Sequence, residues 1–158
     1  MLKMTPYTGS LLITCAVVFF MAGFILMSAP SKKEALMLAL FNALVGIWCL
    51  FQLLGELASD RVLVLLFTKA NVAAAVAIPV VFLGFVAAFT KSGRFSRVWT
   101  TAGLGISLAL ILSLKGTMFI SSLEKTEYFK FYPSAGPLYF VFAAKFFTYV
   151  SAGFYEHI

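Results

Sequence analysis

Charged residues and histidine are scarce in this sequence of 158 residues. Aspartate, glutamate, lysine and arginine make up 11% of the chain, whereas soluble domains carry about a quarter. The single histidine is His157, and the sequence contains no acid pair, metal-ligand set or glycine-rich phosphate loop. We therefore expect no catalytic site, no metal site and no cofactor, and a protein that is not an enzyme.

Cysteine is also rare. Cys15 and Cys49 lie in apolar blocks without metal-ligand spacing, so we expect buried free thiols. The 12 basic residues stand mostly in loops and at helix ends and form no basic stripe, which argues against nucleic acid as a partner.

Apolar residues, in contrast, make up 62% of the chain, more than a soluble fold of this size could bury. They come in blocks of roughly twenty residues, the length that crosses a ~30 Å hydrocarbon core. The blocks do not alternate as membrane strands do. The sequence therefore predicts an all-α, multi-pass protein of the inner or plasma membrane, with a single transmembrane domain over residues 1–158. The five predicted transmembrane helices cover residues 11–27, 35–57, 62–90, 99–120 and 137–155.

The basic residues predict the orientation of these helices. Cytoplasmic loops are enriched in lysine and arginine, and the segment "KSGRFSR" carries three basic residues and no acid. We therefore expect the N-terminus outside and the C-terminus in the cytoplasm. The predicted cytoplasmic loops then hold Lys32, Lys33, Lys91, Arg94 and Arg97.

Six polar residues on four of the predicted helices fall at one depth, the outer third of the bilayer. They are Gln52, Glu56, Lys69, Asn71, Lys115 and Lys145. Such side chains inside a membrane usually face a cavity or a partner. Because three lysines stand against one glutamate, the set predicts a binding site for an anionic group.

Each of these residues also has a structural interpretation. A lysine can extend its ammonium group to the membrane interface. This interpretation is favoured for Lys115. For Lys69 and Lys145 it explains the position as well as ligand binding does. Glu56 can be a surface residue at a helix end, and Asn71 can form a hydrogen bond between helices.

Proline and small residues suggest where the helices bend and pack. Pro79 lies in the middle of the third predicted helix, where it removes a backbone donor. Together with Gly84 it is a candidate hinge, although many membrane helices have a purely architectural kink. The segment "AGLGIS" offers a surface for close helix packing. Ser31 and Glu34 have the spacing of a capping box before the second helix.

Three segments of the sequence resemble the N-terminal seven-helix membrane region of bacterial sensor histidine kinases. They are "FNALVGIWCLFQLLGELASD", "LLFTKANVAAAVAIPVVFLGFVAAFTKSGR" and "YFKFYPSAGPLYFVF", which are similar to that family's second helix, third helix and entry to the fifth. The resemblance implies a membrane sensor. It also implies two further helices and a cytoplasmic signalling domain, which these 158 residues do not contain.

These observations support two hypotheses. In the first, the chain is a sensor or receptor module that detects an anionic or amphiphilic ligand, or the state of the membrane lipids, and signals to a cytoplasmic or partner unit. In the second, it is a non-enzymatic membrane subunit or homo-oligomeric scaffold, including a pore-forming one. Its expected partners are membrane lipids and either further copies of itself or a separate signalling subunit.

Overall fold

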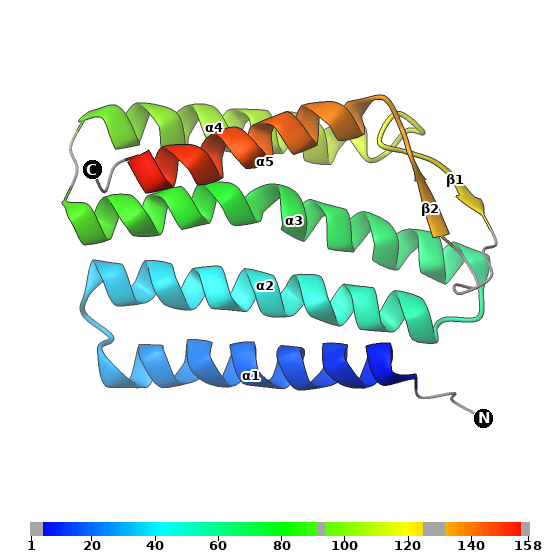
Figure 1. Cartoon of the computed structure of the whole chain (residues 1–158), viewed down its shortest axis with the longest axis horizontal. Coiled ribbons are helices and arrows are strands. Elements are labelled where there is room, and N and C mark those ends of the chain that lie inside the picture. The colour runs from blue at the N-terminus through cyan, green and yellow to red at the C-terminus, as the bar shows by residue number, and fades with distance from the viewer. Residues whose placement is uncertain (1–4, 92–93, 125–131, 156–158) are drawn as a thin grey trace.

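The computed structural model describes residues 5–91, 94–124 and 132–155. This part of the chain forms five helices and one short pair of antiparallel strands (Figure 1). The helices are α1 (Pro6–Ser28), α2 (Lys33–Leu57), α3 (Arg61–Thr90), α4 (Arg94–Ser113) and α5 (Leu138–Tyr155). The strands are β1 (Ile120–Glu124) and β2 (Tyr132–Ala135). The predicted helical class is confirmed, whereas the strands were not predicted.

Helix α3 is the centre of the bundle. It packs against α2 on one side and against α4 and α5 on the other, while α1 packs against α2 (Figure 1). The buried positions of α3 run from Val64 to Val86. Helix α1 begins at one end of the bundle, and α5 ends at the other.

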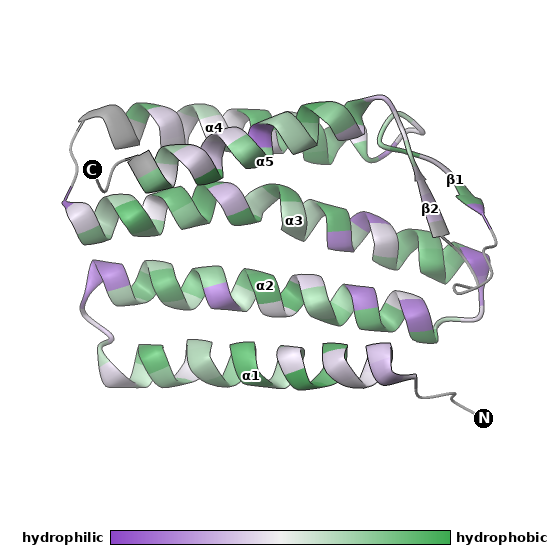
Figure 2. Ribbon diagram, viewed as in Figure 1, coloured by the Kyte–Doolittle hydropathy of each residue, from purple (hydrophilic) through white to green (hydrophobic). Residues whose placement is uncertain are grey.

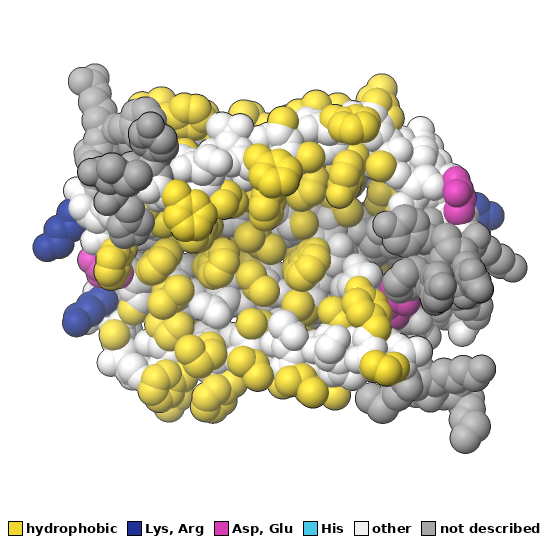
Figure 3. Space-filling model, in the orientation of Figure 1, with side chains coloured by type: hydrophobic (Ala, Val, Ile, Leu, Met, Phe, Trp, Pro, Cys, Tyr) yellow, Lys and Arg dark blue, Asp and Glu magenta, His cyan; other side chains and the backbone are white. Residues whose placement is uncertain are grey.

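The surface of the bundle is that of a membrane protein. Hydrophobic residues cover most of each helix (Figure 2), and the visible charged side chains gather at the two ends of the long axis (Figure 3). Large side chains such as Phe20, Phe140 and Phe147 are at least 70% exposed, as expected where lipid replaces water. Helices α1, α2 and α3 are long and apolar enough to cross a membrane, and α4 and α5 contain shorter apolar stretches, Val98–Ser113 and Leu138–Phe154.

The helix starts are set by local hydrogen bonds. Thr5 caps α1 through a capping box with Thr8, with Pro6 in the first turn, so this helix begins before the predicted residue 11. The Asp60 side chain accepts a hydrogen bond of 2.8 Å from the Val62 amide and caps α3. The capping box predicted for Ser31 and Glu34 is wrong, because α2 is capped by Lys32 without a side-chain bond. Glu34 instead lies in the first turn of α2, where the negative carboxylate interacts favourably with the positive end of the helix dipole.

The predicted end of the fourth helix needs correction. Helix α4 begins at Arg94, earlier than predicted, and ends at Ser113 rather than at residue 120. After Ser113 the backbone hydrogen bonds join residues three positions apart, as is common at helix ends. The last of them runs from the Gly116 amide to the Ser113 carbonyl at 3.2 Å. Lys115 therefore lies in a turn. The chain then enters β1, because Phe119 and Ile120 pair with the segment around Gly136.

Two glycines of α4 allow a test of this packing. A side-chain carbon at Gly103 would lie 2.8 Å from Cζ of Tyr149, whereas one at Gly105 would meet nothing. We expect Gly103→Ala to lower stability by about 1–3 kcal/mol through overpacking. Gly105→Ala should be neutral or stabilising by up to about 1 kcal/mol, because alanine is the better helix former. Thermal unfolding in detergent micelles measures both, and equal effects would contradict the packing of α4 on α5.

Candidate functional site

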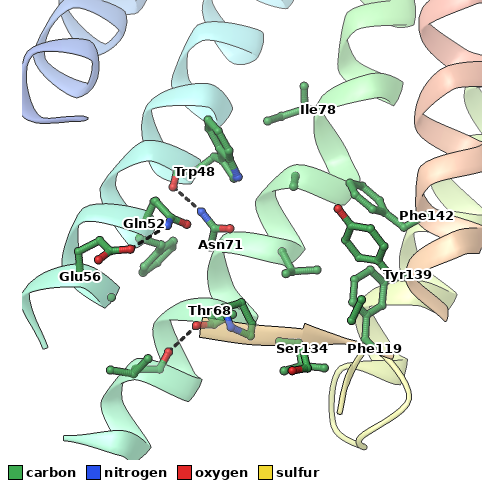
Figure 4. Close-up of a pocket in the computed structure, with 18 of the residues that line it drawn as sticks. Trp48, Gln52, Glu56, Thr68, Asn71, Ile78, Phe119, Ser134, Tyr139 and Phe142 are labelled. Atoms are coloured by element: carbon green, nitrogen blue, oxygen red, sulfur yellow. Dashed lines mark hydrogen bonds between the residues drawn. The ribbon is translucent and has the colours of Figure 1, made fainter. Parts of the chain in front are cut away.

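The structure contains a cavity of about 940 Å³ that lies across α3, between α2 and α5 (Figure 4). Helix α3 lines it with Val64, Thr68, Asn71, Val72, Ala75 and Ile78. Apart from the adjacent Asn71 and Val72, these positions are three or four residues apart, so they form one face of the helix. The wall from α5 is aromatic and consists of Tyr139, Phe142 and Phe146, and β2 borders one end. The aromatic wall was not predicted, although its spacing in the sequence is also that of one helix face.

Polar groups gather on the α2 side of the cavity. Trp48, Gln52 and Glu56 follow one another at intervals of four residues along α2 (Figure 4). The Gln52 amide donates to the Glu56 carboxylate at 3.4 Å. Asn71, which is 8% exposed, donates from Nδ2 to the Trp48 carbonyl at 2.8 Å and so ties α3 to α2. The cavity therefore joins a polar edge to an apolar body, as ligand sites in proteins commonly do.

Three of the six predicted site residues, Gln52, Glu56 and Asn71, thus come together at this cavity. Lys69 does not join them. Lys69 is two positions from Asn71, so its side chain points about 200° away around the helix. It lines a separate hollow of about 380 Å³, together with Arg61 and residues 116–117 and 120–123. Lys115 is exposed in the turn after α4.

Lys145 belongs to a third environment, inside the bundle. It is 6% exposed, and its Nζ donates to the Val76 carbonyl at 2.8 Å and to the Ser107 hydroxyl. Ser107 donates in turn to the Gly103 carbonyl at 2.7 Å. Val76 lies about 22 Å along α3 from Arg61, at 1.5 Å per residue, so Lys145 reaches the middle of the bundle rather than its outer third. Ser107 was not predicted, because a serine in an apolar helix gives no signal of its partner.

Pro79 directly follows the cavity-lining stretch of α3 and comes three residues after Val76, whose carbonyl accepts the Lys145 bond. It is buried within α3, which continues as a helix to Thr90. Because proline lacks an amide hydrogen, the carbonyl of Ala75, four residues earlier, loses its helical donor. Ala75 lines the cavity, and the next carbonyl, that of Val76, accepts the Lys145 bond. Gly84 lies in the following turn, and a side-chain carbon there would meet only the Met37 sulfur at 3.8 Å.

The Lys145 network makes a prediction about stability. Ser107→Ala removes a hydrogen-bond partner from a buried ammonium group and should cost about 1–3 kcal/mol. In a Lys145→Met background the same change should cost much less, because no buried charge then loses a partner. Thermal unfolding of the four proteins in one detergent measures this coupling. An equal loss in both backgrounds would show that Ser107 does not support Lys145.

One comparison with known proteins identifies a family. A family model described as the N-terminal 7TM region of histidine kinase matches residues 10–156. No curated protein matches the chain, and no solved structure matches it. Because the family model covers nearly the whole chain, this protein belongs to the family of N-terminal 7TM regions of histidine kinases, which are membrane sensor regions.

Proposed function

We propose that this chain is a multi-pass sensor module of the inner or plasma membrane that binds an amphiphilic ligand in the cavity across α3. All five helices cross the bilayer, and occupancy of the cavity is passed through α3 to a cytoplasmic or partner signalling unit. The observation that carries the proposal is the cavity itself, because it combines a polar edge with an apolar, aromatic body.

The charges at the bundle ends support an N-out orientation. Lys32 and Lys33 stand where α1 joins α2, and Lys91 follows α3 at the same end of the bundle. Placing this end in the cytoplasm satisfies the preference for basic residues there. The N-terminus, the Glu56 edge of the cavity and the two strands then face outward.

The position of the lysines favours the amphiphilic ligand over the anionic one among the predicted alternatives. Lys69, Lys115 and Lys145 all lie outside the lining of the cavity. The lining instead offers rings and aliphatic side chains over the α3 positions from Val64 to Ile78, about 21 Å at 1.5 Å per residue. This length suits a hydrocarbon chain that runs parallel to the helices.

The relay requires two arrangements of α3 that differ in their affinity for the ligand. Ala75 borders the ligand and its carbonyl is freed by Pro79, while the adjacent Val76 carbonyl holds Lys145 of α5. A ligand that displaces this turn of α3 would therefore shift α5 relative to α3. The inner half of α3, beyond Pro79, is the segment that moves.

Filling the cavity tests the proposal. Spin labels at Leu36 and Phe154, both exposed, report the separation of α2 and α5 at the inner end. We expect at least one of three dodecyl probes to change this distance in phosphatidylcholine nanodiscs: dodecyl glucoside, dodecyltrimethylammonium or dodecyl sulfate. Ala75→Leu should abolish the change by occupying the cavity, whereas Ala102→Leu, at an exposed position of α4, should not. No change with any probe would reject the proposal.

Replacement of the proline separates binding from relay. Pro79→Ala restores an amide donor to the Ala75 carbonyl and stiffens α3. We expect binding of the effective probe to change by less than about threefold, while the change in label distance falls by at least half. A full distance change in Pro79→Ala would show that the hinge lies elsewhere.

A second candidate function is a non-enzymatic membrane subunit or homo-oligomeric scaffold. It is favoured by the small residues on α4, since a side-chain carbon at Gly105 would meet nothing within 4 Å and small residues on a helix surface allow another helix to approach closely. Native mass spectrometry of the purified protein distinguishes the two functions. A monomer or dimer that retains an amphiphile supports the sensor, and a larger homo-oligomer that retains none supports the scaffold.

A further inference from the structure

The cavity carries charge of one sign only. Among its lining residues in the described part of the chain, Glu56 is the only aspartate, glutamate, lysine, arginine or histidine. No ion pair joins Glu56 to a described lysine or arginine, and its described partner is the neutral Gln52 amide, at the long distance of 3.4 Å. The carboxylate is half-buried in the last turn of α2, so it is partly withdrawn from water, and it has no cationic partner among the described residues.

Aromatic rings surround the same space. Trp48 lies two turns before Glu56 on one face of α2 (Figure 4), and Tyr139, Phe142 and Phe146 face it from α5. The faces of aromatic rings attract cations, most strongly for tryptophan and in desolvated sites. A carboxylate beside aromatic rings is complementary to an organic cation, and it repels an anion.

We propose that the ligand of this cavity is a cationic amphiphile, with a protonated or quaternary amine at Glu56 and its hydrocarbon tail passing Trp48 and running along α3 toward Ile78 and Phe146. This inference rests on the proposed function of the cavity and specifies the charge of its ligand. The amine lies at the outer edge of the bundle, where water reaches it before binding. The tail lies deeper, against the aromatic wall of α5.

The fluorescence of Trp48 provides a direct measurement. The chain has two tryptophans, and Trp99 packs against Tyr149 away from the cavity lining. A Trp99→Phe protein therefore reports the cavity through Trp48 alone. In phosphatidylcholine nanodiscs we titrate it with the same three probes, which share a dodecyl tail and differ in head-group charge. A Trp48→Phe protein, whose emission comes from Trp99, corrects for partitioning into the lipid.

The expected order of affinity is cationic first, neutral second and anionic last, with dodecyltrimethylammonium at least tenfold tighter than dodecyl sulfate. Glu56→Gln should weaken the cationic probe about tenfold and leave dodecyl glucoside within about twofold. Glu34→Gln is the matched control, because it removes a carboxylate from the opposite end of α2 and should change neither affinity.

Two results would overturn the inference: dodecyl sulfate binding as tightly as the cationic probe, or a cationic affinity that is unchanged in Glu56→Gln. The order of the three probes on the protein with native Glu56 decides the matter even if Glu56→Gln does not fold. If Ala75→Leu weakens all three probes equally and head-group charge has no effect, the cavity remains the ligand site and only the charge assignment fails. If none of the probes changes Trp48 emission, the proposed function fails with it.

Discussion

The structure depends on one constraint: within the bilayer, polar groups must find hydrogen-bond partners inside the bundle, because there is no water to supply them. Several described side chains meet it by bonding to backbone carbonyls, and three of these bonds join α3 to its neighbours. Asn71 reaches from α3 to the Trp48 carbonyl of α2. Lys145 reaches from α5 to the Val76 carbonyl of α3, and Ser107 of α4 contacts the same carbonyl at 3.3 Å. Each bond fixes a neighbouring helix to α3, so the polar groups that cost most to bury also define the packing.

The central position of α3 explains how one element could serve both the proposed binding and the proposed relay. One face of α3 lines the cavity from Val64 to Ile78, while Val80 and Leu83 form a buried cluster with Tyr149 of α5. Pro79 separates these regions and weakens the backbone bonding between them. A displacement at the cavity would therefore act on the turn that also holds Lys145.

The end of the bundle where α3 begins has two surfaces of opposite character on either side of α3. Arg61 and Lys69 give one hollow a positive charge, while Glu56 gives the larger cavity a negative one. Residues on neighbouring positions of a helix point in directions 100° apart, so a shared depth does not bring side chains together. This rotation separates Lys69 from Asn71, although both lie at nearly the same level.

The sequence alone determined the membrane environment, the helical class and the approximate extent of α2, α3 and α5, because the length of an apolar block and its flanking charges act locally. It also selected Gln52, Glu56 and Asn71, because polar residues are costly in lipid wherever they point. The tertiary structure decided the rest. Helix α4 ends at Ser113 because Phe119 and Ile120 pair with a segment near Gly136. Lys145 turns inward because Val76 and Ser107, 69 and 38 residues away along the chain, lie beside it. Such partners follow from the packing of helices distant in sequence, which no local pattern encodes.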